Sequence, residues 1–103
     1  MAILQDILYK VSIRSVRGNT QTVVKDVQID SRRISRGTAF IAIKGVASDG
    51  HHYIDKAIEK GATVIICEQF PSILYENITY VQVENSASAA GYMAHNFFGQ
   101  PSE

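Results

Sequence analysis

Two short polar segments hold the residues best suited to bind an anionic ligand. The first is DSRR (residues 30–33) and the second is VASDG (residues 46–50). Between them lies TAFIAI (residues 38–43), an uncharged run typical of a strand covered on both faces. Open α/β sheets bind ligands at the carboxyl ends of strands, where backbone N–H groups and a helix N-terminus favour anions. The pattern predicts a ligand site at this edge, with Ser31 supplying a hydroxyl. Ordinary turns before a strand and a helix are the alternative.

The charged residues do not indicate a nucleic-acid partner. Ten basic and ten acidic residues give a formal charge of zero, without the basic excess that nucleic-acid binders usually carry. Five arginines do lie between Arg14 and Arg36. We interpret them as solvated turn and strand-edge residues, with contact to a phosphate-bearing ligand as the alternative.

Metal binding and catalysis find little support in the residue pattern. His51 and His52 are adjacent, so their side chains point in different directions, and no second cluster lies at ligand spacing. We therefore predict no metal site and ordinary roles at a helix start. Cys67 lies in the apolar run TVIIC and is predicted to be a buried thiol. Neither a G-x-S-x-G motif nor a GxxxxGK[ST] phosphate loop occurs, so we predict no catalytic residue and no ATP site of the usual kind.

The elements that must position these residues alternate between helix and strand. Apolar spacing predicts helices near residues 3–8, 53–62 and 86–98, the last with Tyr92, Phe97 and Phe98 in the core. Strands are predicted at residues 23–29, 38–43, 63–67 and 79–83, and Gly18-Asn19 is predicted to be a turn between extended pieces. We expect one α/β domain over residues 1–103, with a mixed, partly parallel sheet flanked by helices.

The sequence also indicates the cellular compartment. No apolar stretch approaches the roughly 20 residues that span a bilayer, and no signal peptide is visible. A single cysteine excludes an intrachain disulfide. We expect a cytoplasmic protein without a membrane partner.

Several motifs occur in a fixed order along the chain: Asp30-Ser31-Arg32, Gly37, the apolar run that ends in Lys44-Gly45, Asp49-Gly50-His51, Tyr53-Ile54 and Gly61-Ala62. In this order they resemble the N-terminal domain of the Mur ligases, which build the peptidoglycan stem peptide. The ending ENSASAAGYMAHNFFGQPSE is more similar to the MurE-type branch, which adds the third residue of the stem peptide. The MurF-type branch, which adds the terminal dipeptide, is one alternative. A non-catalytic interaction module is another.

The resemblance implies a specific role for this domain. It would bind the UDP moiety of UDP-MurNAc-L-Ala-D-Glu, through residues that match the family's uridine-diphosphate contacts: Ile29, Ser31, Val46, Ala47 and Ser48. Arg32 is a plausible phosphate partner, and equally a structural ion-pair residue. ATP and magnesium would belong to a central domain and the amino-acid pocket to a C-terminal domain. We expect both domains to lie outside this chain, and we expect the chain alone to be inactive.

Overall fold

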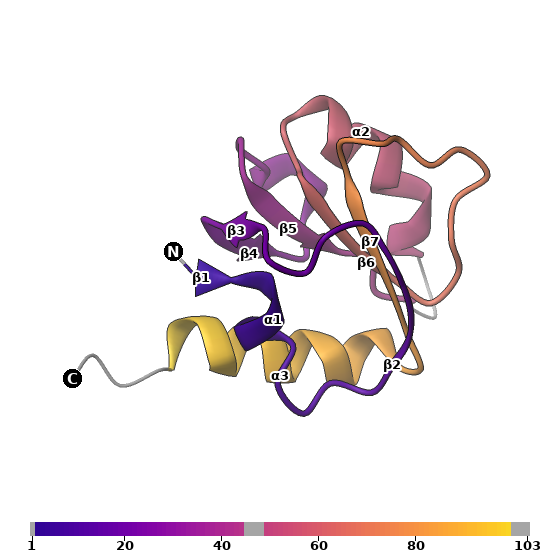
Figure 1. Cartoon of the computed structure of the whole chain (residues 1–103). Coiled ribbons are helices and arrows are strands. Elements are labelled where there is room, and N and C mark those ends of the chain that lie inside the picture. Colours follow the sequence, from indigo (N-terminus) through magenta and orange to yellow (C-terminus); the bar gives the residue numbers. More distant parts are fainter. Residues whose placement is uncertain (1, 45–48, 100–103) are drawn as a thin grey trace.

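The computed structural model describes residues 2–44 and 49–99, which form a five-stranded mixed sheet with helices on both faces (Figure 1). The strand order is β2-β7-β6-β5-β4. Strands β4 to β7 pair in parallel, whereas β2 pairs with β7 in the antiparallel sense. The strands of this sheet are β2 (Ile13–Arg17), β4 (Asp26–Gln28), β5 (Thr38–Ile41), β6 (Val64–Cys67) and β7 (Thr79–Val83). This architecture confirms the predicted fold class.

The central strands are buried on both faces because each contributes to two cores. In β5 and β6 every residue is buried. Successive side chains point to opposite faces of a strand, so Ile41 and Ile66 enter one core while Phe40 and Ile65 enter the other. These strands therefore carry no charged residues, because a charged side chain would be buried on either face of the sheet.

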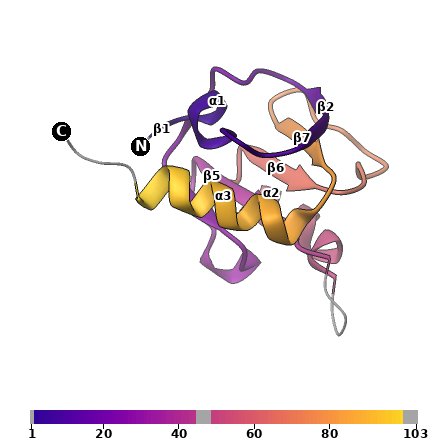
Figure 2. The same ribbon diagram turned by 90° about the horizontal axis from the view of Figure 1, so that it is seen from below.

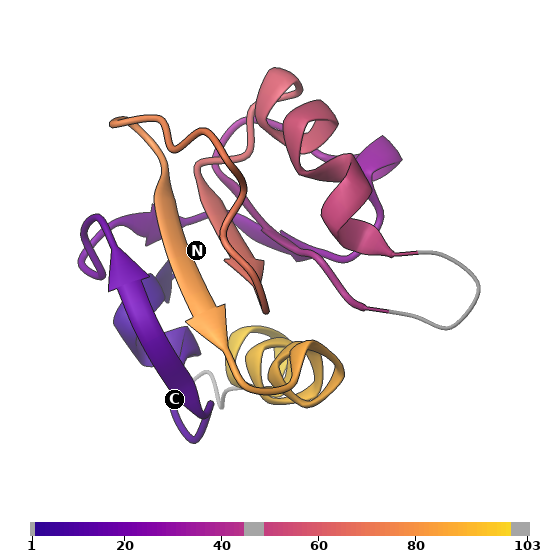
Figure 3. The same cartoon turned by 90° about the vertical axis from the view of Figure 1, so that its right-hand side faces the viewer.

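Helices cover the two faces unequally. One face carries α1 (Leu4–Ile7) and the long α3 (Ser86–Phe98), which crosses the sheet in the view from below (Figure 2). The other face carries α2 (Ile54–Glu59), so the sheet lies between α2 and α3 (Figure 3). Two short 3₁₀ helices complete the fold: η1 (Ser31–Arg33) follows β4, and η2 (Gly50–Tyr53) leads directly into α2.

Local interactions fix where α3 begins and how it holds α1. Asn85 caps α3 by accepting a hydrogen bond from the Ser88 N–H at 2.9 Å. The buried Asn96 side chain donates to the carbonyls of Ile7 and Tyr9, at 2.7 and 2.8 Å. A helix of four residues leaves most of its carbonyls without an intrahelical partner, so this amide satisfies groups that α1 cannot.

Several sequence-based expectations need correction. The stretch predicted as one strand over residues 23–29 divides into β3 (Val23–Val24), which pairs with β1 (Ala2–Ile3), and β4 in the main sheet. The strand predicted over residues 38–43 ends at Ile41, and the helix predicted over residues 53–62 is η2 followed by α2.

The aromatic residues of α3 also differ from the expectation. Tyr92 is 45% exposed and Phe98 is 63% exposed, so neither is a core residue, whereas Phe97 packs partly against the core. Phe98 follows the buried Met93 by five residues, which places it about 140° around a helix that turns about 100° per residue. Among the described residues, no helix has the length and apolar character needed to cross a membrane.

Candidate functional site

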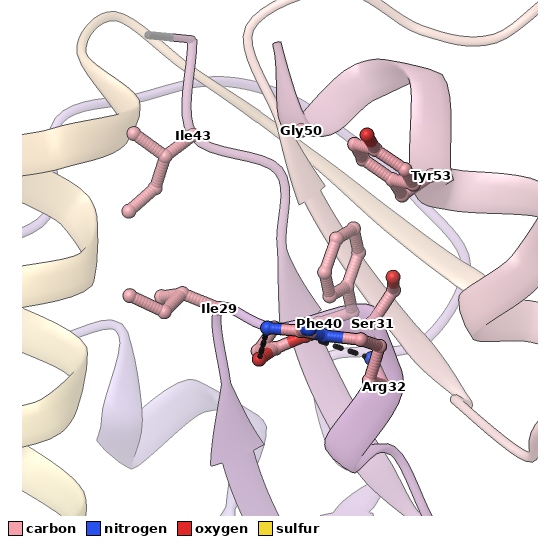
Figure 4. A pocket seen from close by; sticks show the side chains of 8 residues that line it. Ile29, Ser31, Arg32, Phe40, Ile43, Gly50 and Tyr53 are labelled. Carbon is pink, nitrogen blue, oxygen red and sulfur yellow. Dashed lines mark hydrogen bonds and ion pairs between the residues drawn. The ribbon is translucent and has the colours of Figure 1, made fainter. Parts of the chain in front are cut away.

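A cavity of about 590 Å³ opens at the carboxyl ends of β4 and β5 (Figure 4). It lies between η1, which follows β4, and η2, which precedes α2. The lining residues are Ile29, Asp30, Ser31, Arg32, Phe40, Ile43, Gly50 and Tyr53. This is the edge of an open α/β sheet at which ligands typically bind, and it is the edge at which the sequence predicts a ligand site.

The polar wall of the cavity is built around η1. Asp30 caps η1, because its Oδ1 accepts a hydrogen bond from the Arg32 N–H at 2.9 Å. The same carboxylate accepts hydrogen bonds from Arg32 Nε at 3.1 Å and Nη2 at 3.0 Å. These bonds from Arg32 lower the pKa of Asp30 to about 2. The Arg32 side chain is nevertheless 85% exposed, so its guanidinium still has donors facing solvent.

Ser31 lies between these charged neighbours and the apolar part of the cavity. Its side chain extends from η1 into the space that faces Tyr53 (Figure 4). A serine hydroxyl both donates and accepts, so it can bind a phosphate oxygen or a sugar hydroxyl.

The remaining walls are apolar and aromatic. Phe40 is almost fully buried and forms the floor, while Ile29 and Tyr53 are 59% and 42% exposed at the rim. Apolar and aromatic surfaces beside a few convergent polar groups are typical of small-molecule sites. The chemistry therefore suits a ligand with a flat, weakly polar ring at one end and an anionic group at the other.

Gly50 allows η2 to approach the segment that follows β5. Its N–H donates to the Ile43 carbonyl at 2.8 Å. A Cβ at this position would lie 2.8 Å from the Ile43 nitrogen and 3.0 Å from the Ala42 Cα, closer than side-chain carbons pack. Glycine is thus required by contact with backbone, and the cavity wall depends on it.

His51 joins η2 to the carboxyl end of β6. Its Nδ1 lies 2.6 Å from Asp49 Oδ1, and its Nε2 accepts hydrogen bonds from the backbone N–H groups of Glu68 and Gln69 at 2.9 and 3.3 Å. Asp49 also accepts from the His51 N–H, and this bond is the main reason that the pKa of Asp49 is lowered. The histidine thus has the ordinary structural role at a helix start that the sequence predicted.

Glu68 and Ser86 continue these hydrogen bonds toward α3. Glu68 Oε2 accepts from both the N–H and the Oγ–H of Ser86, each at 2.8 Å. These two bonds are the principal reason that the pKa of Glu68 is lowered, with a smaller contribution from the charge of Lys44. Ser86 Oγ in turn accepts from the Lys44 N–H at 2.9 Å.

The structure brings three of the predicted site residues together. Ile29, Ser31 and Arg32 all line the cavity, although their contact with a ligand stays a prediction. Val46, Ala47 and Ser48 lie outside the described residues. Ile43 and Gly50, on either side of that gap, line the same cavity as Ser31.

Sequence reasoning missed the aromatic walls and the hydrogen-bonded carboxylate. Phe40 lies in a predicted strand and Tyr53 in a predicted helix, and their role as cavity walls has no local signal in the sequence. Glu68 could have been found, because it directly follows the strand predicted at residues 63–67 and so lies at the ligand-binding edge.

The other chemical groups considered from the sequence either lie outside the cavity or are unreactive. Of the five arginines, Arg32 lines the cavity, and the other four are exposed elsewhere on the described surface. Burial raises the pKa of the Cys67 thiol to about 12, so it is not a nucleophile at neutral pH. Within residues 2–44 and 49–99, no group of three or more His, Cys, Asp and Glu side chains could hold a metal ion.

Comparison with known proteins defines the class to which this fold and cavity belong. The sequence profile of the "Mur ligase family, catalytic domain" matches residues 23–98, about three quarters of the chain. The chain therefore belongs to the Mur ligase family.

Two relatives share substantial identity with nearly the whole chain. The UDP-N-acetylmuramoyl-L-alanyl-D-glutamate–2,6-diaminopimelate ligase of Cytophaga hutchinsonii is 45% identical over 100 residues, which are 96% of this chain and 21% of that protein. The ligase of the same name from Bacteroides fragilis is 43% identical over 99 residues, which are 96% of this chain and 20% of that protein. The chain thus spans about a fifth of the length of these relatives.

Solved structures confirm the fold. MurF from Acinetobacter baumannii superimposes with a TM-score of 0.76 at 23% identity, over 98% of this chain and 22% of that one. At this identity the similarity supports the architecture alone.

Proposed function

We propose that this chain is the N-terminal domain of a ligase that adds 2,6-diaminopimelate to UDP-MurNAc-L-Ala-D-Glu during peptidoglycan synthesis. The observation that carries the proposal is the cavity lined by Ile29, Ser31 and Arg32, in a chain of the Mur ligase family. The diaminopimelate ligases that resemble the chain are named for this precursor and this amino acid.

The cavity would hold the uridine diphosphate and leave the peptide end of the precursor free. The uracil ring would lie against the apolar walls formed by Ile29, Phe40 and Tyr53. The Ser31 hydroxyl and the exposed Arg32 guanidinium would bind the ribose and diphosphate. Val46, Ala47 and Ser48 are proposed to complete the site. Backbone N–H groups would act at the two apolar positions and a hydroxyl at Ser48.

This binding contributes to catalysis from a distance. Energy gained at the nucleotide end would help to position the D-glutamate carboxyl group in a central domain, where it is activated and then attacked by the incoming amine. The described residues hold no cluster of side chains that would bind magnesium, and the sequence has no phosphate loop of the usual kind. We therefore assign both cofactors to other domains of a cytoplasmic ligase, and we assign no catalytic residue to this chain.

Titration of the 103-residue chain with UDP tests the proposal. We expect weak, measurable binding, because the other domains would close over the ligand in a whole ligase. ADP serves as the matched control, because it carries the same ribose and diphosphate, and weaker binding of ADP would show that the ring contributes to recognition. The double variant Ser31→Ala with Ala47→Trp should lose binding. In a separate assay, the unsubstituted chain should show no ATP hydrolysis. Absence of UDP binding by the unsubstituted chain would contradict the proposal and favour the interaction module.

A MurF-type ligase is the second candidate, because solved MurF structures share the fold. The identity of 45% to a diaminopimelate ligase, against 23% to this MurF, favours the first candidate. Expression of the complete gene and an assay with the dipeptide and tripeptide precursors separates the two. A MurE-type enzyme should accept only the dipeptide precursor as acyl donor.

A further inference from the structure

The hydrogen bonds beside the cavity form a closed circuit. They run from Asp49 through His51, Glu68 and Ser86 to Lys44, as described above. The circuit closes because Lys44 and Asp49 pair with each other in an isolated antiparallel bridge. Three parts of the fold far apart in sequence are thereby joined: the segment after β5, the end of β6 and the start of α3.

The geometry assigns one protonation state to His51. Its Nε2 accepts from two backbone N–H groups, so this nitrogen carries no proton. The ring proton is therefore on Nδ1, where it is donated to Asp49 at 2.6 Å. With both nitrogens occupied, the ring cannot act as a general base, and it instead serves as a spacer of fixed length.

The cavity wall needs such support because the parallel ladder ends early on this side. β5 ends at Ile41, and its pairing with β6 extends by one further bond, from the Ala42 N–H to the Ile66 carbonyl. Ile43 and Gly50, which line the cavity, lie beyond that point. Side-chain hydrogen bonds here replace the ladder bonds that hold the rest of the strand.

We propose that His51 and Glu68 are positioning residues of the nucleotide site: they contact no ligand, but fix the wall formed by Ile43, Gly50 and Tyr53. This inference rests on the proposed function. The inference goes beyond that function because it predicts that affinity for UDP depends on side chains that do not line the cavity.

Two substitutions of His51 separate the hydrogen bond made by Nδ1 from those made by Nε2. In His51→Gln the amide oxygen can reach the position of Nε2 and still accept from the Glu68 N–H. In His51→Asn the shorter amide can reach only the position of Nδ1 and still donate to Asp49. We expect the dissociation constant for UDP to rise about tenfold in His51→Asn and less than about threefold in His51→Gln. His52→Asn is the matched control, because His52 is exposed and outside the circuit, and it should bind like the unsubstituted chain.

Glu68 provides an independent pair of variants. Glu68→Gln keeps an oxygen that can accept both Ser86 bonds and should bind UDP nearly normally, whereas Glu68→Ala should bind about tenfold more weakly. Titrations are made at a temperature where circular dichroism shows each variant to be folded. Because every titrated variant is folded, weaker binding by the disruptive variants cannot come from a general loss of stability.

The outcomes are distinct for the two proposals. If the unsubstituted chain binds UDP and both His51→Asn and Glu68→Ala bind it equally well, the positioning role is wrong and the nucleotide site stands. If the unsubstituted chain does not bind UDP, the proposed function fails, and the positioning role fails with it. Should one disruptive variant not fold, the other decides, because His51→Asn and Glu68→Ala remove different hydrogen bonds of the same circuit.

Discussion

The same substitution, glycine to alanine, should have opposite effects at two positions. Gly50 lies at the cavity wall, and an added Cβ would meet backbone atoms at 2.8 and 3.0 Å. Gly91 lies inside α3, and an added Cβ would meet nothing within 4 Å. Neither has a positive φ, so the comparison isolates packing and helix propensity from backbone strain.

The magnitudes follow from these surroundings. Gly91→Ala should raise the free energy of unfolding by about 0.5–1 kcal/mol, the difference in helix propensity between the two residues. In Gly50→Ala, the two backbone segments must separate by about half an ångström to reach ordinary contact distance, and the Gly50–Ile43 hydrogen bond weakens. Overpacking of this kind costs about 1–3 kcal/mol. Because the two effects have opposite signs, the free energies of unfolding of the two variants should differ by about 1.5–4 kcal/mol.

Urea unfolding followed by circular dichroism measures this difference, and UDP titration of the folded variants measures its effect on the site. We expect Gly50→Ala to bind UDP at least about fivefold more weakly, because the wall moves, and Gly91→Ala to bind it normally. Equal stabilities, or unchanged affinity in Gly50→Ala, would refute the reasoning from close backbone contact.

Three further predictions concern individual side chains. Cys67 should resist thiol reagents at pH 8 until urea unfolds the chain. Burial raises the pKa of this thiol from 9.0 to about 12, so the thiol contributes to stability below pH 9 and this contribution is lost as the pH rises toward 12. Urea unfolding at several alkaline pH values measures the loss. Asp30 should titrate near pH 2 in ¹³C spectra and return toward 3.8 in Arg32→Ala. Its lowered pKa stabilises the fold above pH 3.8, an effect lost as the pH falls through 2. Asn96→Ala should lower the free energy of unfolding by about 1–3 kcal/mol, because the carbonyls of Ile7 and Tyr9 lose their donor. Urea unfolding measures this loss, with a substitution at the exposed neighbour, His95→Ala, as the control.

The buried parallel strands were predictable because their sequences leave few alternatives. An uncharged run such as that of β5 or β6 must be covered on both faces, and the helix between them places the two strands in parallel. The position of the cavity followed from the same rule, because Ser31 and Arg32 come shortly after a strand of that sheet.

The features that were missed depend on contacts between distant residues. β2 pairs with β7, more than 60 residues away, and no local pattern specifies that partner. A polar side chain, Asn96, takes a core-facing position of α3 because the carbonyls it satisfies belong to α1. The aromatic residues on the outer side of α3 were assigned to the core from their apolar character, although helical geometry places Phe98 away from Met93.

The central claim is that the cavity at the ends of β4 and β5 binds uridine diphosphate. The most direct test is a ¹H–¹⁵N NMR titration of the 103-residue chain with UDP, which reports on every assigned amide at once. We predict that the largest shifts occur at Ser31, Arg32, Gly50 and Tyr53. A second cavity of about 430 Å³, beside Tyr92 on the exposed side of α3, provides an internal comparison. Shifts confined to that cavity, or no shifts at η1 and η2, would contradict the account.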